Sequence, residues 1–331
     1  MKNWRPISLL NTDYKIIAHV LATRLQKVIA FIIHPDQNGY IKGRYIGCNI
    51  RTIYDIIETS SNSETANIIT FIDYEKAFDS LKLSFLFKTL ENFGFGPYFI
   101  NWIKTLYKNI TSCVMNNGYS SSFFQLSKGV RQGCPLSALL FILAVETLAI
   151  NIRHDTNIKG VKFQDQEIKI SLFADDTTIF VKDPKSLYTL LETMKLFKKS
   201  SGLNINYSKT KVIQVGLKTW NLNKFKLCEV DKMFSLGTWF HKDYQIINSD
   251  NYDTKFKQFE SILKYWENRN LNILDRIKIV KTYALSKLYY TMSTLQITED
   301  FVLKVQIAIN NFIWKNKRPK IKQIVSHQSI K

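Results

Sequence analysis

Cysteine is scarce in this sequence and is not arranged for metal binding. The chain has 331 residues and four cysteines, Cys48, Cys113, Cys134 and Cys228, with no Cys-x-x-Cys pair and no cluster of cysteine with histidine. This spacing argues against a structural zinc site and against a disulfide framework. The five histidines form no constellation either. A reducing compartment is therefore the expected environment.

The sequence also lacks a long apolar run. The longest strongly apolar stretch, ALLFILAV at 138–145, is followed by Glu146 and is too short to cross a bilayer. No secretory signal opens the chain. We therefore expect a soluble, intracellular protein with no membrane partner.

Acidic residues are in the minority. The chain carries 46 Lys and Arg against 27 Asp and Glu, a net charge of +19. The excess is concentrated at the ends, with 7 basic residues against 2 acidic ones in 1–50 and 15 against 6 in 251–331. Basic ends around a nearly neutral centre suggest a polyanion held from two sides. A membrane surface or a solvated basic face would fit the same charge, so charge alone does not decide.

Helical and strand patterns succeed one another in a set order. Apolar residues at helical spacing predict helices over 13–33, 83–93, 97–106, 135–150 and 187–201, and again from about residue 250 onward. The run NIITFID at 67–73 predicts a buried strand that ends in Asp73, and Asn-Gly at 117–118 predicts a hairpin. Helices, then mixed strands and helices, then helices again indicate an α+β core with a helical appendix.

The stretch SLFADDTTIF at 171–180 sets Asp175 and Asp176 between two strand-like runs, so that the aspartate pair itself would form the tight connection. Adjacent aspartates are commonly no more than turn formers. Here the flanks are strongly apolar, and the strand before Asp73 ends in another isolated acid. Buried carboxylates that converge are costly unless divalent cations neutralise them, and Mg²⁺ prefers carboxylate oxygens. The pattern favours a two-metal site for nucleotidyl transfer.

Several motifs in order resemble those of LINE-type (non-LTR) retrotransposon reverse transcriptases. FIDYEKAFDS, GVRQGCPLS, LFADDTTIF and GLNINYSKTK correspond to the central motifs of that family. NWRPISLLNTDYKIIAHVLATRLQ and HPDQNGYIKGR resemble its finger motifs, FSLGTWF its primer grip and NFIWKNKRPKIK its thumb. The resemblance covers essentially the whole chain.

The resemblance implies catalytic roles for a few residues. Asp73 and Asp175 would bind two Mg²⁺ ions, for which Mn²⁺ could substitute, and Asp176 would be the less direct metal partner. Lys209 would assist the leaving pyrophosphate, with Lys211 as a near neighbour that could be confused with it. These carboxylates and this lysine are the expected catalytic set.

The resemblance also implies binding residues. Arg5 would contact the incoming triphosphate, Phe78 would lie under the sugar and exclude a 2′-hydroxyl, and Gln132 and Gly133 would line the nucleotide pocket. For Phe78 core packing is a rival interpretation, and for Arg5 an ordinary surface charge is. The expected nucleic-acid contacts are Arg44, Gly237, Lys278, Lys281, Lys317 and Arg318.

The family implies a right-hand polymerase fold with helical fingers (1–66), an antiparallel-sheet palm (67–240, with a finger-side insertion at about 95–128) and a helical thumb (241–331). The expected activity is extension of a DNA primer with dNTPs on an RNA template. Nuclear action is what the family implies.

Two other functions are open at this point. A nucleotidyl cyclase also carries carboxylates on a palm-like hairpin, but no cyclase signature occurs here. The chain begins almost on NWRPISLL, and we expect no endonuclease before the polymerase motifs and no Cys-rich or RNase H segment after them. A non-catalytic nucleic-acid-binding remnant of a longer element is therefore the second hypothesis.

Overall fold

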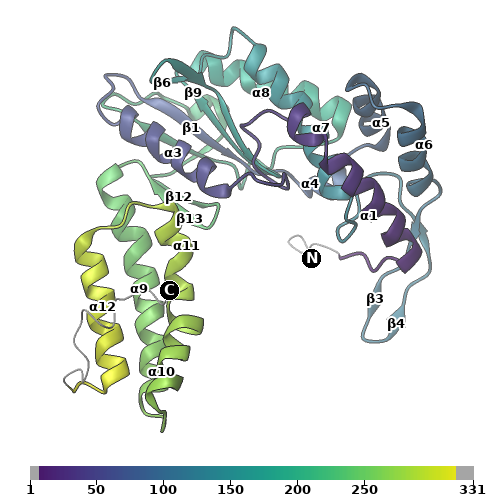
Figure 1. Cartoon of the computed structure of the whole chain (residues 1–331). Coiled ribbons are helices and arrows are strands. Elements are labelled where there is room, and N and C mark those ends of the chain that lie inside the picture. The colour runs from purple at the N-terminus through teal and green to yellow at the C-terminus, as the bar shows by residue number, and fades with distance from the viewer. Residues whose placement is uncertain (1–6, 318–331) are drawn as a thin grey trace. The chain divides into compact units, whose positions relative to one another are not determined.

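The computed structural model describes residues 7–317, and the chain separates into two compact units, residues 1–236 and 237–331 (Figure 1). The first unit contains a sheet with helices, and the second is mostly helical. The mixed helix and sheet content agrees with the predicted α+β class. The proposed limits of fingers, palm and thumb stay a prediction.

A five-stranded sheet organises the first unit. The strand order is β11–β10–β1–β9–β8, antiparallel except for the parallel β10–β11 pair. All six residues of the central strand β1 are buried, so both faces of the sheet are covered there. The bounds are β1 Asn67–Ile72, β8 Ile170–Phe173, β9 Asp176–Val181, β10 Lys211–Val215 and β11 Cys228–Glu229.

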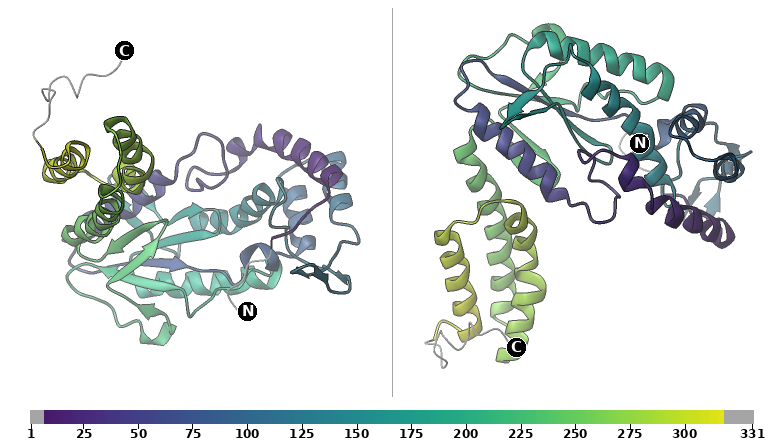
Figure 2. Two further views of the ribbon diagram at one scale, coloured as in Figure 1. Left: turned by 90° about the horizontal axis from the view of Figure 1, so that it is seen from below. Right: turned by 45° about the horizontal axis from the view of Figure 1, so that its top comes forward.

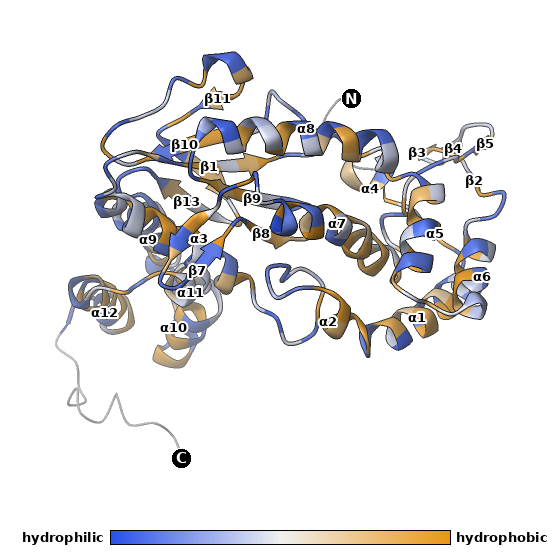
Figure 3. Cartoon of the chain, turned by 90° about the horizontal axis from the view of Figure 1, so that it is seen from above, coloured by the Kyte–Doolittle hydropathy of each residue, from blue (hydrophilic) through white to orange (hydrophobic). Residues whose placement is uncertain are grey.

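Helices cover the two faces of this sheet. Figures 1 and 2 show α7 (Ser137–His154) and α8 (Pro184–Ser201) on one side and α3 (Ile46–Ser60) on the other. Along α8 hydrophobic and hydrophilic residues alternate (Figure 3), and the inner face is made of Leu187, Leu190, Leu191, Met194 and Phe197. The predicted stop of this helix before Gly202 is confirmed, since Gly202 has φ of 85°.

Helix α7 is long and apolar enough to cross a membrane by length and composition alone, but 67% of its residues are buried inside the protein. A helix that is hydrophobic all round is normal in a core. Phe141, Ile142 and Leu143 are among its fully buried residues. We therefore interpret α7 as the central core helix of this unit.

The remaining helices of the first unit confirm most of the periodicity-based predictions. The predicted helix over 13–33 is present as two pieces, α1 and α2, and Pro97 opens α6 as expected. Asn117 and Gly118 both have positive φ, which is what a tight Asn-Gly hairpin turn requires. The bounds are α1 Thr12–Gln26, α2 Ile29–Ile32, α4 Ala77–Ser80, α5 Leu83–Asn92 and α6 Pro97–Leu106.

Short strands and one short helix complete this unit. They are β2 Thr111–Ser112, β3 Met115–Asn116, β4 Tyr119–Ser120, β5 Phe124–Gln125, β6 Val161–Phe163, β7 Gln166–Ile168, β12 Lys232–Ser235 and η1 Asn223–Phe225.

The second unit is built on the long helix α9. Aromatic rings of Tyr252, Phe256 and Phe301 pack together between α9 and α12. Arg276 is buried and donates to the carbonyl oxygens of Phe312 (2.7 Å) and Glu267 (3.1 Å), which ties α10 to the ends of both long helices. The bounds are β13 Thr238–His241, α9 Tyr244–Glu267, α10 Ile273–Ile279, the π-helical η2 Val280–Ala284, α11 Ser286–Thr294 and α12 Glu299–Trp314.

Candidate active site

Three aspartates lie at one edge of the palm-like sheet. Asp73 follows the last residue of β1, and the antiparallel register pairs Ile72 with Thr177. The next pair in that register is Asp73 with Asp176, one residue beyond the end of β1. Asp175 occupies the adjoining turn between β8 and β9. The sequence-based expectation that these acids meet at one end of the sheet therefore has a structural basis in strand register.

The connection between β8 and β9 differs slightly from the expected one. Phe173 pairs with Asp176, so the two turn residues are Ala174 and Asp175, and Asp176 is already the first residue of β9. The prediction that the aspartate pair itself forms the turn was wrong by one residue. Ala174 has φ of 59°, a left-handed conformation at the first central position of the turn, where glycine is usual. Asp175 is thus presented by a strained hairpin.

The loop that carries Lys209 is tied to the backbone of Asp73. The Asp73 amide donates to the Thr210 hydroxyl (3.2 Å), and the Asn206 amide donates to the Asp73 carbonyl oxygen (2.8 Å). Strand β10 then begins at Lys211 and pairs with β1. Lys209 is exposed on this loop. The structure therefore brings the predicted lysine to the same edge of the sheet as the acids.

The acids differ in their access to solvent. Asp73 and Asp175 are half-buried, and Asp176 is exposed. Beside them, burial raises the pKa of Tyr74 to about 12, and the charge of Asp175 adds to the rise. The Tyr74 hydroxyl is thus neutral at ordinary pH and adds no charge to the site.

The carboxylate oxygens at this site suit a hard cation whose remaining ligands come from the substrate. Within residues 7–317 no group of three or more His, Cys, Asp or Glu side chains is assembled to hold a metal ion by itself. Mg²⁺ in such enzymes is commonly bound by one or two carboxylates together with substrate phosphates, not by an all-protein cage. Two half-buried carboxylates next to an exposed lysine fit this pattern. The sharing of metal by all three aspartates stays a prediction.

The position of Phe78 is compatible with both core packing and a role beside the nucleotide. It lies on α4, five residues after Asp73, and its ring stacks on that of Phe141 with centroids 4.4 Å apart. Phe141 is fully buried, whereas Phe78 is only half-buried. One part of the ring packs on the core and another part is accessible, so the role under the sugar stays a prediction.

Gln132 and Gly133 lie against the described start of the chain. The Ser8 amide donates to the Gln132 carbonyl oxygen (2.9 Å), and the Gln132 side chain approaches the Asp79 carboxylate at 3.4 Å. Gly133 has φ of 104°, and an added Cβ would lie 2.9 Å from the Ser8 carbonyl oxygen. Glycine is therefore required here by the chain's own backbone. Pocket-lining roles for both residues stay predictions.

Arg44 has a structural role that the sequence did not indicate. Its guanidinium donates to four carbonyl oxygens, those of Ala30 (3.1 Å), Ile33 (2.7 Å), His34 (2.6 Å) and Gln37 (2.7 Å). These hydrogen bonds fix the end of α2 and the loop that follows it. The predicted contact of Arg44 with nucleic acid stays a prediction, but most of its donors are already used within the protein.

We expect Arg44→Met to destabilise the protein by roughly 3 kcal/mol, because charge-assisted hydrogen bonds are lost and several carbonyl oxygens are left without donors. Chemical denaturation would measure the change in unfolding free energy. Arg51→Met is the matched control: Arg51 is exposed and forms an i,i+4 ion pair with the half-buried Asp55 on α3, and helix pairs of this spacing contribute only about 0.3–0.5 kcal/mol. Equal losses from the two variants would contradict the structural role of Arg44.

The other predicted nucleic-acid contacts are distributed along the second unit. Lys278 on α10 and Lys281 on η2 are exposed, as is Lys317 just after α12. Gly237 has φ of 73°, and an added Cβ would lie 3.0 Å from the ring of Tyr290. Arg5 and Arg318 lie outside the described residues. None of these contact roles is tested by the protein alone.

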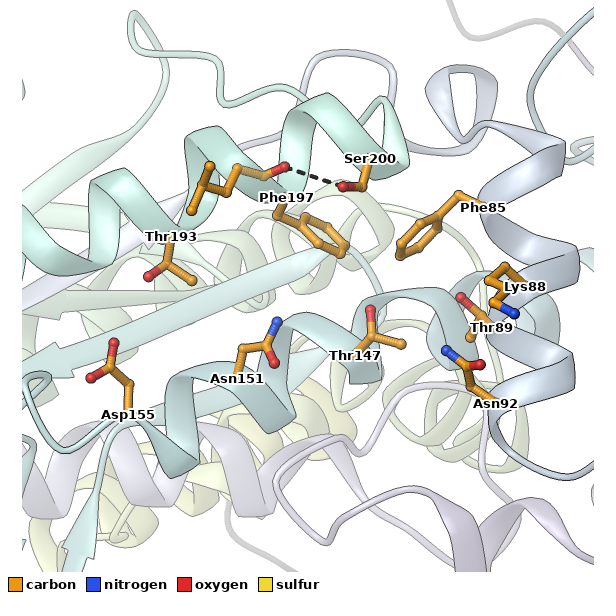
Figure 4. Close-up of a pocket in the computed structure, with 11 residues that line it drawn as sticks. Phe85, Lys88, Thr89, Asn92, Thr147, Asn151, Asp155, Thr193, Phe197 and Ser200 are labelled. Carbon is orange, nitrogen blue, oxygen red and sulfur yellow. Dashed lines mark hydrogen bonds between the residues drawn. The ribbon is translucent and has the colours of Figure 1, made fainter.

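A pocket of about 370 Å³ lies away from the predicted site residues, none of which lines it. Figure 4 shows its walls, which come from α5, α7 and α8 and include Phe85, Thr147 and Phe197. Most of the residues that line it are polar, and only Lys88 and Asp155 among them are charged. It does not take part in the site described above.

Sequence reasoning missed two buried polar residues next to the aspartate turn. Gln37 contacts Ala174, and the Asn49 side chain donates to the Leu172 carbonyl oxygen (2.9 Å) and the Ser171 hydroxyl (2.8 Å). Gln37 stands in the polar stretch HPDQNG at 34–39, so its neighbours in the sequence do not mark it as a buried residue. These partners of Gln37 and Asn49 lie more than a hundred residues away in the chain, and no local pattern reveals such pairs.

Comparison with known proteins identifies the family. A family profile described as reverse transcriptase (RNA-dependent DNA polymerase) matches residues 1–240. The chain belongs to this family of RNA-dependent DNA polymerases. Its sequence is 30% identical over 329 residues to the Transposon TX1 uncharacterized 149 kDa protein of Xenopus laevis, covering 96% of this chain and 25% of that protein.

Further comparisons agree on element type and fold. The Pol polyprotein of the type-2 retrotransposable element R2DM of Drosophila melanogaster is 28% identical over 70% of this chain and 21% of its own length. The LINE-type identification is therefore confirmed, and the chain spans about a quarter of the length of these relatives. Apo telomerase from Candida tropicalis has a similar fold, with a TM-score of 0.50, 14% identity and coverage of 92% of this chain and 55% of that one. The predicted polymerase fold is confirmed.

Proposed function

We propose that this chain extends the 3′-hydroxyl of a DNA primer with dNTPs on an RNA template, as the polymerase part of a LINE-type element. The observation that supports this most is the meeting of three segments at one sheet edge in a chain of the reverse transcriptase family. Asp73 directly follows β1, Asp175 lies in the β8–β9 turn, and Lys209 lies on the loop before β10.

Reverse transcriptases depend on divalent metal ions, and the finer proposal is two Mg²⁺ ions, with Mn²⁺ as a substitute. Asp73 and Asp175 would hold them, with Asp176 as the less direct partner. Bound there, the ions would supply charge neutralisation at the attacking and leaving oxygens of the phosphoryl transfer. The half-buried carboxylates and the accessible lysine are the local chemistry that supports this assignment.

Each remaining residue would orient substrate or move a proton. Lys209 would donate a proton to the leaving pyrophosphate, because an ammonium on an exposed loop beside the acids can reach the triphosphate. Gln132 and Gly133 would line the nucleotide pocket, Phe78 would lie below the sugar, and Arg5 would contact the triphosphate. These roles follow the family motifs that the residues match.

The basic second unit would bind the template–primer duplex. Lys278 and Lys281 are exposed on neighbouring turns, and lysines of this kind contact phosphates without reading sequence. The whole element would need further parts, such as an endonuclease and an RNA-binding protein. The chain covers about a quarter of the length of these relatives. The alternative function is that of a remnant that binds nucleic acid without catalysis.

Primer extension by the purified chain tests this function. We expect labelled DNA primer on an RNA template to be extended when Mg²⁺ and dNTPs are present, and extension to stop when EDTA removes the metal. Binding should be measured in parallel at rising salt, since phosphate contacts weaken as salt increases. Salt-dependent binding with no extension under any metal condition would reject the polymerase in favour of the non-catalytic alternative.

A further inference from the structure

The aspartate turn adopts a conformation that its sequence does not favour. Ala174 takes φ of 59° at the first central position of the β8–β9 turn, next to Asp175. A residue with a Cβ populates this region about 5- to 30-fold less than the relaxed backbone conformations. Glycine would avoid this cost. Something outside the turn must therefore favour the observed geometry.

Gln37 grips both polar groups of the strained residue. Its Oε1 accepts from the Ala174 amide at 2.8 Å, and its Nε2 donates to the Ala174 carbonyl oxygen at 3.3 Å. The same Oε1 accepts from the Gly39 amide at 2.8 Å. Gln37 is 1% exposed, so water cannot replace these bonds. One side chain thus fixes the orientation of the peptide groups on both sides of Ala174.

The segment around Gln37 is itself held against β8. The Leu172 amide donates to the Asp36 carbonyl oxygen (2.8 Å), and the Asn38 amide donates to the Leu172 carbonyl oxygen (2.9 Å). At Gly39 the approach is so close that an added Cβ would lie 2.3 Å from the Ala174 amide nitrogen. The grip on Ala174 therefore comes from a fixed support and not from a mobile loop.

We propose that Gln37 is a positioning residue for the polymerase site, acting through Ala174 to orient Asp175. This inference rests on the proposed function of Asp175. The side chain does not touch substrate in this account. It holds the turn in the conformation that presents Asp175 at the end of the sheet where Asp73 follows β1. It thereby lowers the population of turn conformations that direct the Asp175 carboxylate elsewhere. The apparent affinity for metal then depends on that population.

Replacement of Gln37 by methionine tests this role, because methionine retains the length and volume while removing both hydrogen-bonding groups. We expect Gln37→Met to raise the Mg²⁺ concentration needed for half-maximal extension by about 5- to 30-fold, as the relaxed turn becomes populated. In a chain that already carries Ala174→Gly, the further change Gln37→Met should raise the required Mg²⁺ concentration much less. The reason is that glycine adopts positive φ without support from Gln37.

A matched control is available in the same unit. Gln214 is 4% exposed and grips Trp220 in the same way, accepting from its amide at 2.7 Å and donating to its carbonyl oxygen at 3.0 Å. Gln214 lies on β10 opposite Ile68, near the far end of β1 from Asp73. Gln214→Met should lower stability to a similar degree, leave the Mg²⁺ dependence unchanged, and gain nothing from Ala174→Gly.

Amide hydrogen exchange gives a second readout that needs no polymerase activity. The Ala174 amide of the wild-type chain should be strongly protected, and Gln37→Met should expose it selectively. If the wild-type chain extends no primer, the proposed function fails. Hydrogen exchange at Ala174 still tests whether Gln37 holds the turn through its hydrogen bonds to Ala174. An unprotected Ala174 amide in the wild type, or equal shifts in Mg²⁺ dependence for Gln37→Met and Gln214→Met, would overturn the inference.

Discussion

Asp175→Asn is expected to reduce primer extension by about a thousandfold or more, because a neutral amide of the same shape cannot hold a divalent cation. In the metal-free protein the same change should raise the unfolding free energy or leave it level. Removing one charge relieves its repulsion with the neighbouring carboxylates of Asp73 and Asp176. Single-turnover extension and chemical denaturation in EDTA would measure the two effects.

Two further variants show whether the loss is specific. Asp176→Asn should cost less activity, since Asp176 is exposed and begins β9 outside the turn. Asp165 occupies the second turn position of the β6–β7 hairpin, as Asp175 does in its own hairpin, but that hairpin forms a separate two-stranded sheet. Asp165→Asn should leave extension unchanged. Full activity of Asp175→Asn would remove this aspartate from the mechanism.

Phe78→Ala is expected to raise incorporation of ribonucleotides relative to deoxyribonucleotides by more than about a hundredfold. An apolar pocket alone rejects an added hydroxyl by only about that factor or less, so the ring must act by steric exclusion at C2′. Some stability should also be lost, because the ring stacks on Phe141 and such pairs add about 0.5–1.5 kcal/mol beyond burial. The ratio of rNTP to dNTP incorporation and the unfolding free energy are the two measurements.

Phe85→Ala separates these effects. Phe85 is also half-buried and forms an edge-to-face pair with Phe197 at 5.5 Å, but on the wall of the pocket described above. It should lose comparable stability without any change in sugar preference. If Phe78→Ala is destabilised and its incorporation ratio stays at the wild-type value, the ring is core packing only.

The elements that the sequence predicted well are those with strong local signals. The buried strand β1 follows from a run of β-forming residues, although it ends at Ile72, one residue before the predicted end at Asp73. Helix α8 follows from its apolar spacing and from Gly202 after its last turn. The Asn-Gly hairpin at 117–118 is equally local. In each case the residues that decide the structure lie within one element or its cap.

Long-range contacts escaped prediction for a physical reason. Gln37 meets Ala174 across 137 positions, and a lone polar residue gives no sign of its distant partner. The division of the turn between Ala174 and Asp175 depended on pairing register, which is set by packing of the whole sheet. The break of the helix after Ile279 by a π-helical segment likewise has no signal in the apolar period.

The position of divalent metal in a ternary complex tests the central claim most directly. Crystals of the chain with an RNA–DNA primer duplex, an incoming dNTP and Mn²⁺ would reveal the ions by anomalous scattering. We predict two anomalous peaks about 3.5–4 Å apart, both in contact with the carboxylates of Asp73 and Asp175 and with phosphate oxygens. A bound dNTP with its Mn²⁺ held by other residues, or with no ion at these two aspartates, would contradict the account.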